Sequence, residues 1–429
     1  MLVALVVIAV AVAIVGVVSQ SGESDRPAAE PSPASGETSA TPTPSSSPTP
    51  STSEAPTDTG VQLWDQQFVY ACRLVAPADV ARVFGPSGSK GYVRQQYLDR
   101  TPTSTELSGA SAFAYGGLAT RCTHWFDDLK GHQLDVVVTQ FPSPALVQRR
   151  LTTLLRSQGR GAKKRPAAAL RVQGTEGRLL YVPFERSFLV TADNLIVEVR
   201  YATDRSLKKP RLMSEAEMDR QVELMKRVVR TVDQHLADGT AVFRPVPTTD
   251  RVKGTVGGTP YVEPCRVLGT AEFTAIGGPP PEPVVVDTSV IRHDPWSNAA
   301  VSSCERSGTQ RDGGAEKTSS TFAVLEIRVA PDAAAAQKVL EEHLANRYPK
   351  GTDVAELATD VGTAYVIDVP ATKNDPLRTR VVHVVVGEYE LRLAAVLDVG
   401  PKRKAGRPPT DEQLVAAVDA LAEAVKGAA

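Results

Sequence analysis

The chain has 429 residues, which is too long for one ordinary hydrophobic core and suits two domains with additional segments. Its 48 Lys and Arg residues nearly balance its 49 Asp and Glu residues. Overall charge therefore gives no indication of a nucleic-acid-binding protein or of a protein that needs a strongly acidic partner. Four cysteines are too few to make a disulfide scaffold of a chain this long.

Residues 1–19 are predicted to be a membrane segment. The run from Leu2 to Val18 is apolar without interruption, and a helix of that length spans about 26 Å, just short of a bilayer's hydrocarbon core. No Lys or Arg precedes the run, unlike an ordinary signal sequence. We expect an uncleaved single-pass transmembrane anchor at the cell membrane, with the bulk of the chain outside the cell. The alternative is secretion after signal cleavage, because Val17-Val18-Ser19 satisfies the small-residue rule of a cleavage site.

Residues 20–60 consist almost entirely of Ser, Thr, Pro, Ala, Gly and Glu. Such a segment has no side chains that build a core, and its prolines favour an extended backbone. We predict a disordered linker that holds the rest of the chain away from a membrane.

A short motif occurs twice, 193 residues apart. The matched positions are Cys72 and Cys265, Arg73 and Arg266, Gly85 and Gly278, and Pro86 and Pro279. Self-similarity at a fixed spacing indicates one kind of domain used more than once. We predict a first domain over 61–238, a linker rich in Gly, Pro and Thr over 239–260, and a second domain over 261–429.

The predicted elements follow the same order in both domains. In the first we expect helices over 77–83, 143–157 and from 214 onward, and strands over 134–138, 177–182 and 195–201. In the second we expect helices over 332–346 and from 410 onward, and strands over 322–329, 364–369, 380–386 and 389–397. Each closing helix begins with a capping box, Ser214-x-x-Glu217 or Thr410-x-x-Gln413. The predicted fold class is α+β, as two tandem copies of a sandwich of an antiparallel sheet and helices.

Each predicted domain contains two cysteines. Four thiols allow three pairings, and spacing alone does not choose among them. The repeat favours Cys72 with Cys122 and Cys265 with Cys304, because each bond then stays within its own domain. Two pairs of buried free thiols are the alternative. Zinc is not predicted, because there is no Cys-x-x-Cys and no histidine stands at ligand spacing.

The cysteine motif also suggests a family. A Cys-x-Leu or Cys-x-Val opening leads into a short helix that ends at Gly, and a second Cys follows tens of residues later. This pattern resembles the domains of unknown function in membrane-anchored proteins and lipoproteins of actinobacteria, which are similar to the PsbP-like α/β sandwich. The resemblance covers about 68–236 and 264–425, and implies a topology and a cell-envelope location without catalytic residues. The chain departs from it in lacking a lipidated cysteine and in carrying tandem copies.

No catalytic, cofactor-binding or metal-binding residues are predicted. The histidines are His124, His132, His235, His293, His343 and His383. None recurs at equivalent positions in both domains, and no two stand four residues apart as helical metal ligands do. We single out His124, beside Cys122 and Trp125. Ser87-Gly88-Ser89-Lys90 matches Ser-x-x-Lys, but the partner motifs of that chemistry are missing. We therefore expect a protein that is not an enzyme and has no cofactor.

A run of basic residues distinguishes the first domain. No acid occurs between Arg149 and Arg171, whereas the matching span of the second domain mixes both signs. The residues predicted to bind a polyanion are Arg149, Arg150, Arg156, Arg160, Lys163, Lys164 and Arg165. On an extracytoplasmic protein they would meet anionic wall polymers, lipid headgroups or another envelope protein. An ordinary solvated loop is the alternative.

These predictions together indicate a non-enzymatic, extracytoplasmic cell-envelope protein whose tandem domains bind another component from a membrane-tethered stalk. One alternative is a carrier of a small apolar or lipid ligand, which requires a large apolar pocket. A second alternative is an enzyme of unrecognised type, which requires a cleft that gathers a histidine with acids or a nucleophile.

Overall fold

The structure is a computed structural model, and only part of the chain is described. The described residues are 61–84, 92–109, 116–126, 133–158, 180–182, 187–202, 215–238, 255–293, 300–311, 318–348, 352–370, 377–400 and 406–428. The predicted membrane segment and the predicted linker after it, residues 1–60, lie outside these ranges. Within them, no helix combines the length and the apolar character that a membrane span requires.

One antiparallel sheet of 13 strands runs through the described chain, in the order β14-β15-β16-β17-β13-β12-β11-β3-β4-β5-β8-β7-β6. The strands of the N-terminal half, 61–238, are β3 (Tyr92–Leu98), β4 (Leu118–Trp125), β5 (Gln133–Gln140), β6 (Leu180–Val182), β7 (Ser187–Ala192) and β8 (Leu195–Ala202). Those of the C-terminal half, 255–428, are β11 (Val284–His293), β12 (Ala300–Arg311), β13 (Thr318–Val329), β14 (Val354–Thr359), β15 (Gly362–Val369), β16 (Thr379–Val386) and β17 (Tyr389–Val399). With the helices below, this confirms the α+β class.

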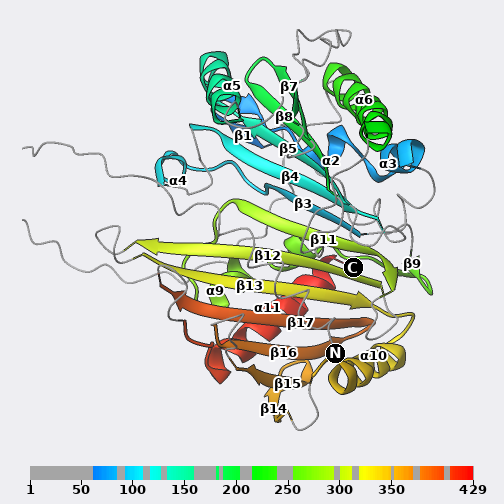
Figure 1. Cartoon of the computed structure of the whole chain (residues 1–429). Helices are drawn as coiled ribbons and strands as arrows, with labels where there is room; N and C mark the ends of the chain where they lie inside the picture. The colour runs from blue at the N-terminus through cyan, green and yellow to red at the C-terminus, as the bar shows by residue number, and fades with distance from the viewer. Residues whose placement is uncertain are drawn as a thin grey trace, which may run out of the picture. The chain divides into compact units, whose positions relative to one another are not determined.

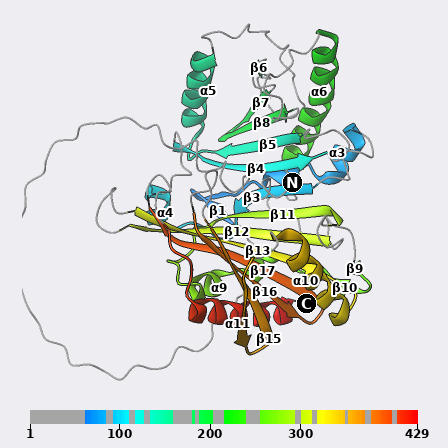
Figure 2. The same ribbon diagram turned by 60° about the horizontal axis from the view of Figure 1, so that its bottom comes forward.

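Helices lie on both faces of the N-terminal half (Figure 2). They are α2 (Ala71–Leu74), α3 (Pro77–Phe84), α4 (Ser104–Gly109), α5 (Pro144–Gln158) and α6 (Glu215–Asp238). Successive residues of a strand point to opposite faces, and β8 shows this clearly. Its Ile196 packs with Val147 of α5, whereas its Val197 lies in the cluster that includes Val229 of α6.

The C-terminal half also carries helices on both faces. They are α8 (Pro264–Val267), α9 (Thr270–Ala275), α10 (Ala333–Arg347) and α11 (Asp411–Ala428). Ile327 of β13 and Leu391 of β17 lie in the apolar cluster formed with α8, α9 and α11. Their neighbours in sequence point to the other face, where α10 packs against β13, β16 and β17 (Figure 1). The predicted capping box of α11 is present, because the Gln413 amide donates to Thr410 Oγ1 and the Thr410 amide donates to Gln413 Oε1.

The middle of the sheet differs from the sequence prediction. No helix or strand was predicted between α3 and Cys122, where the structure contains β3 and α4, and β11 was not predicted either. Strand β3 carries Arg94, Gln95 and Gln96, which do not alternate with apolar residues. The pattern that marks a half-buried strand is therefore absent. Strands β14 and β7 and the short helices α2 and α8 were also missed.

Strands β3 and β11 join the two halves, and we call this strand pair the seam. Its register runs from Val284 opposite Leu98 to Val290 opposite Tyr92. Two ion pairs cross it. Arg94 Nη2 lies 2.8 Å from Glu305 Oε2, and Arg306 Nη1 lies 2.6 Å from Asp99 Oδ2. The predicted division into separate domains stays a prediction.

Each half contains one disulfide. Cys72 of α2 is bonded to Cys122 of β4, and Cys265 of α8 to Cys304 of β12. These are the pairs that the internal repeat favoured, and no described cysteine is free. Each bond holds a short helix, which has few hydrogen bonds of its own, against the strand next to the seam.

Removing either disulfide is expected to destabilise the protein. The variants C72A/C122A and C265A/C304A should each lower the free energy of unfolding by about 2–5 kcal/mol, because each bond restricts the unfolded chain. Chemical denaturation monitored by circular dichroism measures this change. A loss below about 0.5 kcal/mol in both variants, within the usual effect of a surface substitution, would contradict the role assigned to the bonds.

Candidate functional site

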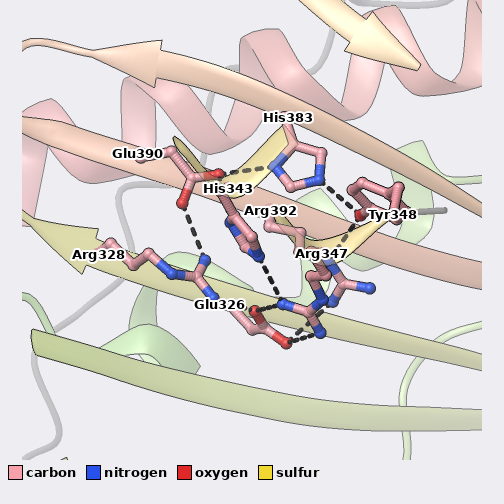
Figure 3. Close-up of polar contacts among 8 residues, drawn as sticks. All are labelled: Glu326, Arg328, His343, Arg347, Tyr348, His383, Glu390 and Arg392. Carbon is pink, nitrogen blue, oxygen red and sulfur yellow. Dashed lines mark hydrogen bonds and ion pairs between the residues drawn. The ribbon is translucent and has the colours of Figure 1, made fainter. Parts of the chain in front are cut away.

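A buried polar cluster lies between α10 and the sheet (Figure 3). We call it the α10 cluster, and its members are Glu326 and Arg328 of β13, His343 and Arg347 of α10, Tyr348, His383 of β16, and Glu390 and Arg392 of β17. The side chains of His343, His383 and Glu390 are 0% exposed. So dense a group of buried polar residues needs nearly complete internal hydrogen bonding to be stable.

Two Glu-x-Arg segments form the base of the α10 cluster. Glu326 and Arg328 occupy one strand, and Glu390 and Arg392 occupy its antiparallel neighbour. The register places Glu326 opposite Arg392 and Arg328 opposite Glu390. Opposite charges therefore face each other across the strands, which is the favourable arrangement for a cross-strand pair. The residue between each Glu and Arg points into the apolar cluster on the other face.

Glu326 is the centre of the charged contacts. It accepts hydrogen bonds from Arg328 Nη2 at 2.6 Å, Arg347 Nη1 at 2.7 Å and Arg392 Nη1 at 2.9 Å. Burial by itself raises the pKa of Glu326, but the three guanidinium charges, that of Arg392 foremost, hold it well below its usual range. Glu326 is therefore ionised, and it joins β13, β17 and α10 through charge-assisted hydrogen bonds.

Glu390 continues the network through His383. Its Oε2 accepts from Arg328 Nη1 at 2.9 Å, and its Oε1 lies 2.7 Å from His383 Nδ1. Burial raises the pKa of Glu390, but the Arg328 charge and the two histidines that face its Oε1 hold it well below its usual range. Because an ionised carboxylate only accepts, His383 Nδ1 carries the proton. Burial lowers the pKa of His383 to about 4, so its ring is neutral at pH 7.

Tyr348, the residue after α10, closes a ring of hydrogen bonds. Its hydroxyl lies 2.7 Å from His383 Nε2 and accepts from Arg392 Nε at 3.3 Å. Since His383 Nδ1 holds the ring proton, Nε2 accepts from the hydroxyl. Arg392 and Arg328 both donate to Glu326, so the hydrogen bonds among these residues form a closed ring. The ring ties the end of α10 to three strands.

His343 is the second neutral histidine of the α10 cluster. Arg347 Nη1 lies 2.9 Å from its Nε2, and since arginine only donates, Nε2 is the acceptor and Nδ1 carries the proton. Nδ1 lies 3.6 Å from Glu390 Oε1 and has no hydrogen-bond partner among the described residues. Burial lowers the pKa of His343. Arg347 is in the last turn of α10, where a cation also meets the negative end of the helix dipole.

The α10 cluster contains a group with metal-ligand chemistry, but its surroundings do not suit a cation. His343, His383 and Glu390 offer ligand atoms within 4.8 Å of one another. Both histidines, however, carry protons on the Nδ1 atoms that face Glu390. Arg347 Nη1 also donates to Nε2 of His343. The His343 proton therefore cannot move from Nδ1 to Nε2, because two hydrogen-bond donors would then face each other. Nearby guanidinium charges add repulsion in a buried site. The arrangement fits a structural network.

His124, the histidine singled out from the sequence, has a different role. It is buried, its Nε2 donates to the Val75 carbonyl at 2.9 Å, and that nitrogen lies 3.3 Å from Cys122 Sγ. Burial lowers its pKa to about 4. His124 thus satisfies a carbonyl at the end of α2, as a helix terminus requires.

Arg306 forms the corresponding hydrogen bonds to the end of a short helix in the C-terminal half. It stands two residues after Cys304, as His124 stands two residues after Cys122. Its guanidinium donates to the carbonyls of Leu268 and Cys265, at the end of α8. The Arg306 guanidinium also forms an ion pair with Asp99 on the other side of the seam. The shorter imidazole of His124 does not reach across the seam.

Sequence reasoning missed the α10 cluster. His343 and His383 lie on different elements, so no spacing rule relates them. The signal available was the pair of Glu-x-Arg segments, each within an otherwise apolar strand. Alternation of charged and apolar residues is also typical of a solvent-facing strand, so the pattern by itself does not indicate burial.

Most of the predicted polyanion-binding residues lie outside the described structure. Arg149 is exposed and Arg150 is half-buried on α5. Arg156 belongs to the same helix, but its side chain is outside the description. Arg160, Lys163, Lys164 and Arg165 also lie outside the described residues.

Comparisons with protein-family models, with curated proteins and with solved structures find no match. The resemblance to actinobacterial envelope domains therefore stays a prediction.

Replacing Glu326 is expected to destabilise the protein strongly. E326Q keeps the shape of the side chain but leaves three guanidinium groups without their shared carboxylate. The loss should be about 3–5 kcal/mol of unfolding free energy, as for breaking a buried ion pair from one side. D368N is the control, because Asp368 pairs with Arg380 while 73% exposed, and should lose less than about 1 kcal/mol. Equal losses would contradict the importance given to the α10 cluster.

The buried histidines predict acid sensitivity. A histidine whose folded pKa lies below its ordinary value of 6.5 adds stability that is complete above pH 6.5 and declines as pH falls toward the folded value of about 4. The slope is about 1.4 kcal/mol per pH unit for each such group. Glu326 and Glu390, whose pKa values are lowered, lose their contributions only as pH falls below 4.5, their ordinary value.

Variants of single histidines separate the contribution that each ring makes to the pH dependence of the free energy of unfolding. Between pH 4.5 and 6.5, H383Q and H124Q should each reduce the dependence of unfolding free energy on pH, and the double variant should reduce it by the sum, because the residues lie in different halves. Denaturant titrations at several pH values measure this. An unchanged slope in H383Q would show that His383 is protonated equally in the folded and unfolded states.

Proposed function

We propose that the chain is an extracytoplasmic cell-envelope protein in which two copies of one α+β unit bind another envelope component without catalysing a reaction. The observation that carries this proposal is one disulfide in each half, joining corresponding elements. Structural disulfides persist in oxidising compartments and are rare in the cytosol. The apolar run at residues 2–18 supports tethering to a membrane.

Corresponding hairpins support the proposed duplication. In the N-terminal half, β1 (Gln62–Leu63) and β2 (Gln66–Gln67) turn through Trp64 and Asp65, with φ of 52° and 61°. In the C-terminal half, β9 (Thr255–Val256) and β10 (Thr259–Pro260) turn through glycines at 257 and 258, with φ of 60° and 99°. Both are two-residue turns with positive φ, and they lie 193 residues apart, like the cysteine motif.

The corresponding residues on β4 and β12 give further support. The β4 cysteine is followed at the second position by a donor to the end of α2, and the β12 cysteine by a donor to the end of α8. A central helix and a closing helix then cover opposite faces in each half. This agreement of hairpin, disulfide, cap and helix is what a duplication would produce.

One observation favours an enzyme as the second candidate. Glu390, His383 and Tyr348 form a carboxylate–imidazole–hydroxyl chain with 2.7 Å contacts, and such chains activate nucleophiles. Two features oppose this candidate. Glu390 already binds Arg328, and the lowered pKa of His383 makes its ring a weak base. A structural role accounts for both features, so we prefer binding to catalysis.

The basic run of the N-terminal half indicates the chemistry of the partner. Cations without nearby acids repel one another, and an anionic surface would offset that repulsion. We propose that anionic polymers or lipid headgroups bind there. Exposed Arg149, at the start of the run, is available for this contact.

The binding proposal predicts that neutralising part of the basic run removes binding to anionic vesicles and leaves the fold intact. Replacing Arg160, Lys163, Lys164 and Arg165 with Gln should remove most binding to vesicles that contain phosphatidylglycerol, because each cation near such a surface contributes about 1 kcal/mol. Thermal stability should not change. Vesicle sedimentation measures the binding, which should fade as salt is raised to about 1 M, where the Debye length is about 3 Å.

A matched control neutralises four cations of the C-terminal half, Lys402, Arg403, Lys404 and Arg407, and should leave the binding intact. Phosphatidylcholine vesicles and soluble polyphosphate separate a need for a lipid surface from a need for negative charge alone. Equal losses in both variants, or binding that salt does not weaken, would contradict the proposal.

A further inference from the structure

Two histidines hold the C-terminal end of α10 through the same ring atom. His343 Nε2 accepts from Arg347 Nη1 at 2.9 Å. His383 Nε2 accepts from the Tyr348 hydroxyl at 2.7 Å. Arg347 is the last residue of α10, and Tyr348 follows it as the C-cap. His343 thereby orients Arg347, which binds Glu326, and His383 ties Tyr348 to β16 (Figure 3). Both contacts need an imidazole that has no proton on Nε2.

Protonating either ring removes that acceptor, because an imidazolium carries a proton on both nitrogens. On His343 the new proton would face the Arg347 guanidinium, so two donors would meet. On His383 it would face the Tyr348 hydroxyl, which already accepts from Arg392 and would lose the ring as its own acceptor. Acid therefore acts on both residues that end the helix.

The charges around the two rings oppose their protonation. The polar groups that face the rings are Glu326 and Arg328 of β13, Arg347 of α10, the Tyr348 hydroxyl, and Glu390 and Arg392 of β17. Glu390 favours charged rings, since its Oε1 lies 2.7 Å from Nδ1 of His383 and 3.6 Å from Nδ1 of His343. Glu390 already binds Arg328, however, and Glu326 binds all three guanidinium groups. The two rings are themselves only 5.0 Å apart. Burial accordingly lowers the pKa of both histidines.

Little apolar packing remains to hold α10 on the sheet when its polar contacts weaken. The buried residues of the helix are Ala336, Leu340 and His343, so it fully buries only one large apolar side chain. In contrast, α11 on the other face buries Leu414, Val418, Leu421 and Val425. The strands under α10 also pair with one another through their backbones. Release of the end of α10 therefore costs less free energy than unfolding of the C-terminal half.

We propose that the end of α10 is a pH-sensitive switch, in which protonation of His343 and His383 releases Arg347 and Tyr348 from the sheet while the rest of the C-terminal half stays folded. In the released state the two Glu-x-Arg segments of β13 and β17 are open to solvent. The switch concerns one helix and is therefore distinct from the overall loss of stability in acid. It does not depend on the proposed binding role.

Amide hydrogen exchange of the full wild-type chain tests the switch. Released histidines have the ordinary pKa of 6.5, whereas the pKa of His383 in the folded protein is about 4. His383 alone thus favours release about 30-fold more at pH 5.0 than at pH 7.5. After correction for the intrinsic effect of pH on exchange, amides in the last turns of α10 should lose protection by at least that factor.

Comparison with other elements distinguishes local release from general unfolding. At pH 5.0 the amides at the end of α10 should be at least about tenfold less protected than those of α11 and β17. Low urea concentrations should hardly change their exchange, because a local release exposes little surface. Protection of α10 equal to that of α11 and β17 at pH 5.0 would overturn the proposal, because α10 would then open only when the whole half unfolds. Protection of α10 that is the same at both pH values would overturn it too.

A double variant tests the assignment to the two histidines. H343Q/H383Q removes both titrating groups and keeps an acceptor at each position, since the Gln carbonyl accepts hydrogen bonds. Protection of its α10 should therefore lose the dependence on pH. H124Q is the matched control, because His124 is also buried with a lowered pKa but lies in the other half, and its α10 should respond as in the wild type. A full response in the double variant, or a lost response in H124Q, would contradict the proposal. The wild-type measurement decides the question if the double variant does not fold.

Discussion

The contact between Glu326 and three guanidinium groups determines how the C-terminal half is built. Moving these charges out of water is strongly unfavourable, and only their mutual hydrogen bonds offset it. One carboxylate joins two strands and α10 by accepting hydrogen bonds from Arg328, Arg347 and Arg392. The contact therefore specifies where α10 lies along the sheet. An apolar surface alone would define that position less closely.

The neutrality of His343 and His383 follows from this constraint. With three cations nearby, a further positive charge would be repelled, and both rings instead accept hydrogen bonds from donors already present. The corresponding face of the N-terminal half uses apolar packing, with Phe141, Val147 and Ile196 under α5. The two halves thus stabilise a helix on the same kind of sheet by different means. We attribute the α10 cluster to structural specificity and the proposed binding to other surfaces.

The sequence predicted the parts of the fold that depend on apolar periodicity. The central and closing helices and the long strands β13, β16 and β17 were expected, because their apolar residues recur at helical or alternating spacing. The cysteine pairs followed from the internal repeat. Strands β3 and β11 were not expected, since Gln95 and Asp287 meet only in the folded chain and local sequence does not reveal a partner distant in the chain. Glu326 and Glu390 were missed for the same reason, because a charge in a strand usually faces water.

The protonation of the two histidines tests the structural account most directly. Nitrogen chemical shifts of the imidazoles, measured by NMR on the full chain at pH 7, identify the protonated ring atom. The account predicts that His343 and His383 are both neutral with the proton on Nδ1, as their contacts with Arg347 and Tyr348 require. An imidazolium, or a proton on Nε2 of His343, would contradict it, because the contact between that nitrogen and Arg347 would then join two donors.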